Sequence, residues 1–137
     1  MKNLMHLHKN LKSESSNNAN KRILIVDDEK NIRSFLKIMF RSEGYVVNEA
    51  ENAKEGLNIL EYNNIELITL DLGLPDIDGM QMLDIIREKY PKLPVIILSV
   101  RDNILAKKIA TRMDVNNYIV KPFDAGEVLE AANKILV

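Results

Sequence analysis

Residues 22–44 read RILIVDDEKNIRSFLKIMFRSEG and hold the first copy of the pattern that decides the fold. The largely apolar run Arg22 to Val26 is typical of a buried strand. Apolar residues then recur at helical spacing as far as Gly44, which is a stop signal for a helix; they are Ile32, Phe35, Leu36, Met39 and Phe40. The stretch therefore predicts one strand followed by one helix.

The same strand-then-helix pattern recurs four more times along the chain. The expected pairs are strand Val46 to Ala50 with helix Ala53 to Tyr62, strand Leu67 to Asp71 with helix Gly79 to Lys89, strand Val95 to Ser99 with helix Asn103 to Met113, and strand Asn117 to Val120 with helix Asp124 to Leu136. Strands that are joined by single helices run parallel, with right-handed crossovers. Five such units predict an α/β fold and are too few for an eight-fold barrel.

The composition of the strands predicts their order in the sheet. The first, third and fourth strands are almost wholly apolar, as expected for strands that are covered on both faces. The second strand, which contains Asn48 and Glu49, and the short fifth strand are better suited to the edges. We therefore predict a flavodoxin-like, doubly wound sheet of five parallel strands in the order 2-1-3-4-5, with a ligand site beyond the carboxyl ends of the first and third strands.

Composition limits the number of domains and the classes of chemistry. A chain of 137 residues fits one domain, and we expect residues 21–137 to form it and the polar residues 1–20 to be a flexible leader. The sequence contains neither an apolar stretch long enough to span a bilayer nor a signal peptide, so we expect a cytoplasmic protein without membrane contact. Cysteine is absent and the two histidines, His6 and His8, lie in the leader, which disfavours thiolate and histidine-dependent chemistry. The net charge of −1 predicts no general affinity for nucleic acid.

Polar side chains stand where the strands end. Asp27 and Asp28 follow the first strand, and the others are Asp71 on the third, Ser99 on the fourth and Lys121 after the fifth. Any one of them could be a helix cap or a surface charge, but together at one edge of a parallel sheet they form a set. Three carboxylates in one place repel one another, and oxygen ligands favour Mg²⁺, Mn²⁺ or Ca²⁺ as the neutralising cation. The hydroxyl and the ammonium then predict a cradle for phosphoryl oxygens.

Four segments resemble the signatures of response-regulator receiver domains. They are Val26-Asp27-Asp28-Glu29, the run LDLGLPDIDG from Leu70 to Gly79, Leu98-Ser99, and the run YIVKPF from Tyr118 to Phe123. The resemblance covers Lys21 to Val137. Within the family, the sequence is most similar to the receivers of winged-helix transcriptional regulators, including the potassium-responsive ones. It implies a phosphoacceptor domain of a two-component signalling system, whose partner is a sensor histidine kinase.

The resemblance also implies a role for each residue of the set. Asp71 is the implied phosphoacceptor, and Asp28 and Asp71 are implied to bind Mg²⁺ directly, with Mn²⁺ or Ca²⁺ as possible substitutes in binding. Gly73 would supply a backbone carbonyl to the metal, and Asp27 would act partly through metal-bound water. Ser99 and Lys121 would neutralise the phosphoryl oxygens.

A conformational switch follows from the same resemblance. Ser99 would move toward the phosphoryl group, and Tyr118 would turn inward into the space that Ser99 leaves; the alternative is that Tyr118 is a plain strand aromatic. The responding face would comprise the fourth helix, the fifth strand and the fifth helix. The Lys121-Pro122 peptide is usually cis in the family, which the sequence alone does not establish.

Two acidic residues have a local interpretation. An EF-hand is excluded around Asp78, because counting Gly79 as its sixth position puts Leu74 first and Ile85 twelfth, so we predict Asp78 to be the cap of the following helix. Asp114 occupies the place after a helix that favours left-handed backbone.

Some positions depart from the family pattern. Lys107 and Glu127 match one ion pair of the dimer face of the winged-helix subfamily, whereas Asn117 and Ala131 replace the two partners of another. We therefore predict only a possible homodimer through this face.

Val100 stands beside Ser99 where the family has a smaller residue, which predicts slower phosphorylation. The sequence contains no DNA-binding domain to interpret, so we expect no direct DNA binding by this chain.

Two other functions compete with a working receiver. One is a docking module that keeps the receiver fold but does not signal through phosphate, which Val100, Asn117 and Ala131 favour. The other is a Mg²⁺-dependent phosphatase with an aspartyl nucleophile. That class requires an acidic residue two positions after the nucleophile, where this chain has Gly73.

Overall fold

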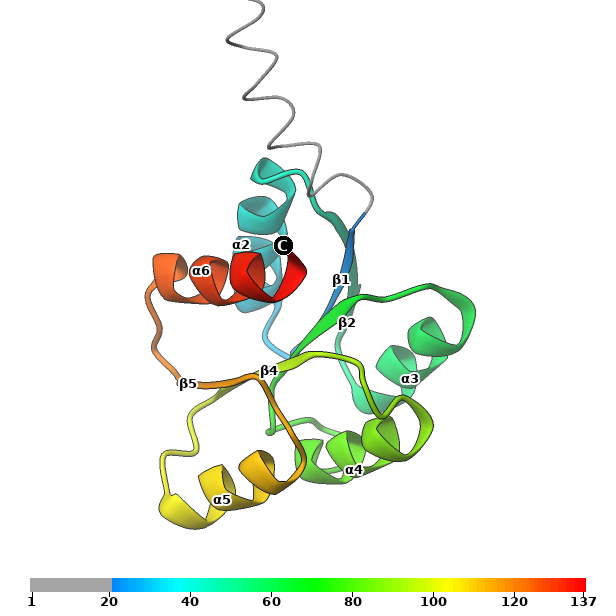
Figure 1. Ribbon diagram of the computed structural model, residues 1–137, viewed down its shortest axis with the longest axis vertical. Coiled ribbons are helices and arrows are strands. Elements are labelled where there is room, and N and C mark those ends of the chain that lie inside the picture. The colour runs from blue at the N-terminus through cyan, green and yellow to red at the C-terminus, as the bar shows by residue number, and fades with distance from the viewer. Residues whose placement is uncertain (1–20) are drawn as a thin grey trace, which may run out of the picture.

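The five predicted strands are present, run parallel and alternate with helices (Figure 1). The computed structural model describes residues 21–137, so the expected leader and its two histidines lie outside the described residues. In chain order the elements are β1 (Arg22–Val26), α2 (Lys30–Ser42), β2 (Val46–Ala50), α3 (Ala53–Tyr62), β3 (Leu67–Leu70), α4 (Gly79–Lys89), β4 (Val95–Ser99), α5 (Ile104–Arg112), β5 (Asn117–Val120) and α6 (Ala125–Leu136). The strand order β2-β1-β3-β4-β5 confirms the predicted fold class and topology.

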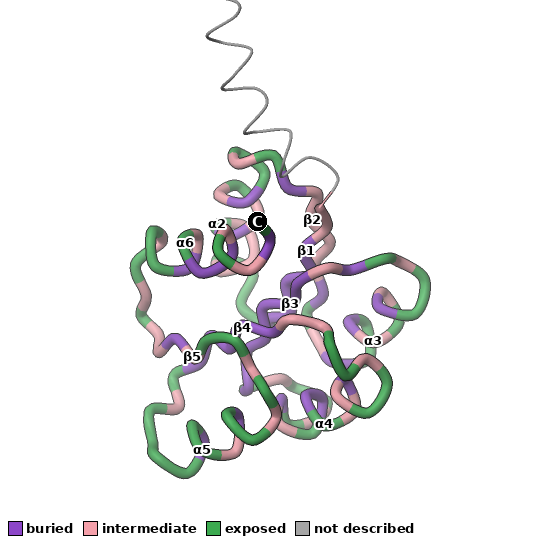
Figure 2. Tube along the Cα trace, viewed as in Figure 1, coloured by how far each residue is buried: buried purple, intermediate pink, exposed green. Residues whose placement is uncertain are grey.

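Helices cover both faces of the sheet. Figure 1 shows α2 and α6 on one face and α3, α4 and α5 on the other. Each face of the sheet has its own hydrophobic core, and alternate residues of β1 pack into each. Ile23 and Ile25 pack in the cluster beneath α2 and α6, while Leu24 and Val26 pack in the cluster on the opposite face. Figure 2 shows the central strands as buried and the outer sides of the helices as exposed. Full burial of each such side chain contributes about 1.5–3 kcal/mol, so the central strands form a rigid base for whatever lies at their ends.

Side-chain caps set where four of the helices begin. The side chain of the capping residue accepts a hydrogen bond from the first turn at Asn52, Asp78, Asn103 and Asp124. Asp78 forms a full capping box with Gln81, which confirms its prediction as a helix cap. Because Asn103 and Asp124 are caps, α5 and α6 begin one residue later than predicted. The strand predicted to end at Asp71 ends at Leu70, and α5 ends at Arg112 instead of Met113.

The chain leaves two helices through left-handed backbone. Gly44 follows α2 with φ of 94°, and Asp114 follows α5 with φ of 57°. The Asp114 conformation confirms the expectation for that position. The guanidinium of Arg87 donates to the carbonyl oxygens of Met113 and Asp114 at 2.6 and 3.2 Å, which fixes this exit against α4.

The register of the sheet brings the carboxyl ends of the central strands together. Val26 lies beside Leu70 in the β1–β3 pair, and the Asp71 amide donates to the Val26 carbonyl at 2.9 Å. At the other side, the Lys121 amide donates to the Ser99 carbonyl at 2.8 Å, and the Lys121-Pro122 peptide is cis. The edge predicted to carry the polar set therefore exists. Among residues 21–137, no helix has the length and apolar character to cross a membrane.

Candidate functional site

Four acidic side chains converge at the carboxyl edge of the sheet. Asp27, Asp28 and Glu29 follow β1 and Asp71 follows β3, and one carboxylate oxygen from each lies within 4.8 Å of the others. Asp27 and Asp71 are buried, whereas Asp28 and Glu29 are exposed. Oxygen donors without histidine or cysteine fit a hard divalent cation such as Mg²⁺. The predicted carboxylates are thus brought together, and Glu29 joins them.

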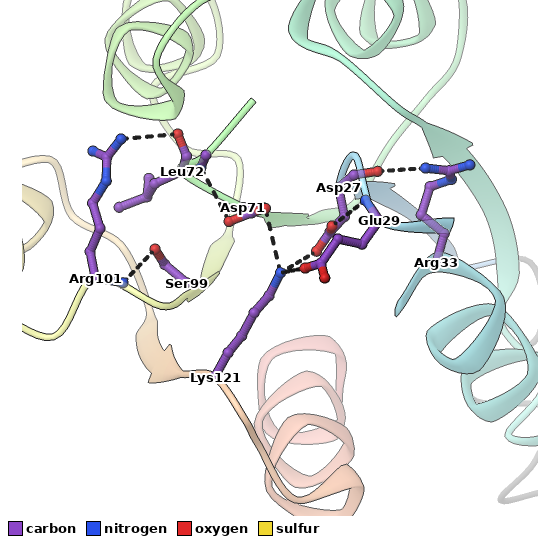
Figure 3. A network of polar contacts seen from close by, with 9 residues as sticks. Asp27, Glu29, Arg33, Asp71, Leu72, Ser99, Arg101 and Lys121 are labelled. Atoms are coloured by element: carbon purple, nitrogen blue, oxygen red, sulfur yellow. Dashed lines mark hydrogen bonds and ion pairs between the residues drawn. The ribbon is translucent and has the colours of Figure 1, made fainter. Parts of the chain in front are cut away.

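Lys121 provides the positive charge at the centre of this cluster. Its side chain is only 7% exposed, and its Nζ lies 2.8 Å from Asp27 Oδ2, 3.0 Å from Glu29 Oε1 and 3.4 Å from Asp71 Oδ2. Figure 3 shows Lys121 extending from the end of β5 toward these carboxylates. An ammonium group has three donor hydrogens, so the three carboxylates can use all of them. The structure therefore unites Lys121 with Asp71, as the sequence predicts.

Burial and charge act in opposite directions on the pKa values of the site. Burial raises the pKa of Asp27 and of Asp71, while hydrogen bonding and the charge of Lys121 oppose that rise. Burial by itself would lower the pKa of Lys121, but its hydrogen bonds to Asp27 and Glu29 prevail and raise it. The lysine stays positively charged at neutral pH and keeps that charge beside Asp71.

Backbone groups orient the two buried carboxylates. The Glu29 amide donates to Asp27 Oδ1 at 2.9 Å, and the Gly73 amide donates to Asp71 Oδ1 at 3.2 Å. The guanidinium of Arg33 donates to the Asp27 carbonyl oxygen at 2.8 Å, which ties the start of this loop to α2. Each carboxylate therefore has one oxygen held by the backbone and the other directed at Lys121.

Ser99 and Tyr118 meet at one residue that the sequence did not single out. Ser99 is 1% exposed, and its Oγ accepts a hydrogen bond from the Arg101 amide at 3.1 Å. The Tyr118 hydroxyl donates to the Arg101 carbonyl at 2.7 Å, and its partly buried ring packs against the core beneath α3, α4 and α5. Figure 3 shows Ser99 and Arg101 to the left of Asp71, while Lys121 approaches Asp71 from below. Burial raises the pKa of Tyr118, so its hydroxyl remains a donor at neutral pH.

The residues of the predicted dimer face are spread over α5, β5 and α6. Lys107 pairs within the chain with Asp102 at 2.7 Å and lies 6.0 Å from the centroid of the Tyr118 ring. Glu127 is exposed in the first turn of α6, and Asn117 is also exposed. Ala131 is buried in the core beneath α2 and α6. The dimer pairing of Lys107 and Glu127 stays a prediction.

The structure adds three residues that sequence reasoning missed: Glu29, Arg33 and Arg101. Of these, Glu29 alone had a signal in the sequence, which is its position beside two aspartates. Nothing local marks Arg33 or Arg101, because the partners of their side chains lie elsewhere in the sequence. Val100, for which we predicted slower phosphorylation, is 73% exposed.

Comparison with known proteins finds a matching family and similar folds. Residues 23–133 match the family model described as the response regulator receiver domain. Among solved structures, the chain resembles a CheY-like receiver domain protein of Methanospirillum hungatei with a TM-score of 0.82 and 30% identity, over 86% of this chain and 94% of that one. It also resembles TrrA of Thermotoga maritima, solved in complex with Mg²⁺ and beryllofluoride, with a TM-score of 0.76 and 35% identity, over 84% of this chain and 98% of that one.

Curated relatives carry names of transcriptional regulators. The chain is 37% identical over 123 residues to a probable transcriptional regulator, ycf27, of Cyanidium caldarium, which covers 88% of this chain and 49% of that protein. It is 36% identical over 114 residues to the transcriptional regulatory protein SrrA of Staphylococcus aureus, which covers 83% of this chain and 47% of that protein. The chain thus spans about half the length of these relatives.

Proposed function

This chain belongs to the response regulator receiver family, and on that premise we propose that Asp71 accepts a phosphoryl group from a sensor histidine kinase in a Mg²⁺-dependent reaction. The observation that carries the proposal is the position of the Asp71 carboxylate. It is buried, it lies in a cluster of four acidic residues, and its Oδ2 is 3.4 Å from Lys121 Nζ. Few structural roles bring a buried nucleophile, a fixed cation and extra carboxylates to one point.

The acidic cluster is our proposed Mg²⁺ site. Receiver domains bind Mg²⁺ at an acidic pocket, and the oxygen donors of this cluster fit that ion. We assign Asp28 and Asp71 as direct ligands, the Gly73 carbonyl as a third ligand, and Asp27 as a ligand through metal-bound water. A bound ion would neutralise charge on the phosphoryl oxygens.

The residues of the chain have separate tasks in the transfer. An Asp71 oxygen attacks the phosphorus of a phosphohistidine, so that an O–P bond forms, the P–N bond breaks and the imidazole nitrogen keeps the electron pair. An ionised carboxylate needs no general base for this attack. The Lys121 ammonium and the Ser99 hydroxyl stabilise the charge on the oxygens of the transferred group.

The proposed output is a change in the face formed by α5, β5 and α6. Movement of Ser99 toward the phosphoryl group would act on Tyr118 through Arg101, to which both are hydrogen-bonded. A homodimer through this face, with Lys107 of one copy beside Glu127 of the other, is the partner arrangement that we propose. Exposed ion pairs contribute about 0–1 kcal/mol each, so they would select the partner more than strengthen the dimer.

The test is to incubate the protein with Mg²⁺ and acetyl phosphate and to measure its intact mass. We expect one added phosphoryl group, lost in Asp71→Asn and retained in Asp84→Asn, which removes an exposed carboxylate from α4. Omission of Mg²⁺ should prevent the addition. If the wild-type protein gains no phosphoryl group under these conditions, the docking-module alternative is favoured, and repeated hydrolysis of phosphomonoesters would favour the phosphatase.

A further inference from the structure

Arg101 contacts four parts of the molecule around the candidate site. Its guanidinium forms a two-pronged contact with Asp78, with Nη1 3.1 Å from Oδ1 and Nη2 2.8 Å from Oδ2. Nη2 also lies 3.4 Å from the carbonyl oxygen of Leu72, the residue after Asp71. Such planar, bidentate pairs are the geometrically specific form of an arginine–carboxylate contact. The side chain therefore joins the loop after β4 to the loop after β3.

The backbone of Arg101 serves the two residues of the proposed switch. Its amide donates to Ser99 Oγ, and its carbonyl accepts from the Tyr118 hydroxyl. A shift of this one residue would alter both hydrogen bonds together. The guanidinium, which anchors Arg101 to Asp78, thus also holds Ser99 and Tyr118 in place.

Apolar packing does little to position the first turn of α5. The buried residues of this helix are two alanines, Ala106 and Ala110. Ile104 and Leu105 in the first turn are 72% and 68% exposed. A groove of 210 Å³ runs between this turn and α4, lined by Met80, Arg101, Asn103, Leu105, Ala106 and Ile109. Small buried side chains contribute little contact area, so apolar packing restrains this turn only weakly and the contact of Arg101 with Asp78 is the polar link from it to α4.

We propose that Arg101 is a positioning residue, whose bidentate contact with Asp78 holds the loop after β4 and the first turn of α5 and thereby fixes Ser99 and Tyr118 relative to Asp71. We call this contact the Arg101–Asp78 clasp. The clasp also links the N-terminal cap of α4 to the switch, because Asp78 Oδ1 accepts from the Met80 amide as well. Its consequence for phosphorylation rests on the proposed function, whereas its effect on the loop does not.

Asp78→Asn is the sharpest test, because asparagine caps helices as well as aspartate does but cannot accept the bidentate, charge-assisted contact. Asp84→Asn on the exposed side of α4 is the matched control. In the unphosphorylated protein without Mg²⁺, we expect Asp78→Asn to speed hydrogen exchange of the Arg101 and Ala106 amides, which donate to Ser99 Oγ and Asn103 Oδ1, by up to about fivefold, the upper end for losing an exposed ion pair. The ring signals of Tyr118 in tyrosine-labelled NMR spectra should shift in the same variant and stay unchanged in the control.

Arg101→Gln breaks the same contact by changing its other partner. If both variants show the effect, a folding defect of one variant does not explain it. Arg101→Gln should reproduce both effects, and adding Asp78→Asn to it should produce little further change. Equal exchange in Asp78→Asn and Asp84→Asn, an unshifted Tyr118, or a full additional effect in the double variant would each overturn the clasp.

Phosphorylation by acetyl phosphate and Mg²⁺ then tests the positioning role. We expect its rate to change severalfold in Asp78→Asn and Arg101→Gln but not in Asp84→Asn. Unchanged rates in proteins that have lost the clasp would overturn that role. Should even the wild-type protein accept no phosphoryl group, the proposed function would fail, while exchange and the Tyr118 signals would still decide on the clasp.

Discussion

The absence of a β-carbon at Gly79 allows α4 to begin directly against the loop that carries Asp71. A β-carbon at this position would lie 2.4 Å from the Leu72 α-carbon and 2.7 Å from the Asp71 carbonyl oxygen. Both are backbone atoms, which cannot rotate away as the end of a side chain can. The glycine in the motif is therefore required by the close approach of two backbone segments.

Replacing Gly79 with alanine should displace the loop and with it Asp71. We expect Gly79→Ala to lower the free energy of unfolding by about 2–3 kcal/mol, as overpacking does, and to slow phosphorylation by acetyl phosphate. Gly126→Ala is the control, because a β-carbon there meets only Asp124 Oδ1 at 3.7 Å. It should be neutral or stabilise by up to about 1 kcal/mol through helix propensity. Urea unfolding of the two variants measures the difference, and equal stabilities would show that the contact is relieved at no cost.

At the scale of elements, α2 is attached to the edge strand β2 by charge as well as by packing. Glu49 accepts from Lys37 Nζ at 2.6 Å and from Arg33 Nε at 3.0 Å. The hydrogen bond from Lys37 is the main reason that the pKa of Glu49 lies below its usual value. Since Arg33 also holds the Asp27 carbonyl, this contact joins the edge strand to the start of the acidic cluster.

The lowered pKa of Glu49 predicts how its contribution depends on pH. Because the folded protein binds the proton less readily than the unfolded chain, the stabilisation is present at neutral pH and is lost as the pH falls below about 4.5, the ordinary glutamate value. Because the pair is partly exposed, we expect Glu49→Gln to cost about 1 kcal/mol at pH 7 and less at pH 3. Urea unfolding at both pH values tests this, with the exposed Glu61→Gln as control. A cost for Glu49→Gln that is equal at the two pH values would contradict the prediction.

At the scale of the whole molecule, folding gathers charged residues from distant parts of the chain. β1, β3 and β5 deliver Asp27, Asp71 and Lys121 to one point at the edge of the sheet. Burial raises the pKa of both aspartates, so their ionised forms oppose folding. The lysine offsets this cost in the folded chain, and a divalent cation would offset it further.

Lys121→Met should reveal the free-energy cost of burying the two ionised aspartates. Without Mg²⁺ we expect the variant to lose about 3 kcal/mol of stability, because two buried carboxylates lose their counter-charge. With Mg²⁺ the variant should recover more stability than the wild-type protein gains, since the cation then becomes the main source of positive charge. Thermal unfolding with Mg²⁺ and with a chelator measures both effects, with the exposed Lys108→Met as control. An equal gain from Mg²⁺ in all three proteins would mean that Lys121 and the ion act at separate places.

The sequence by itself determined the five strand–helix units, the strand order and the set Asp27, Asp71, Ser99 and Lys121 at one edge. These follow from periodicity and apolar runs, which are local properties of a chain, and from the rule that parallel strands share a carboxyl edge. The cap at Asp78 was predictable for the same reason. Element ends were one residue off where Asn103 and Asp124 serve as caps, because a cap and the first helical residue look alike in a sequence.

Only the tertiary structure decided which side chains meet. The contact of Lys121 with Glu29, and those of Arg101 with Asp78 and Tyr118, join residues whose spacing in the chain follows no pattern. Side-chain contacts of this kind depend on the register of the sheet and on the rotamers that packing leaves open. Local periodicity carries information about neither, so the edge was predictable from the sequence while the clasp across it was not.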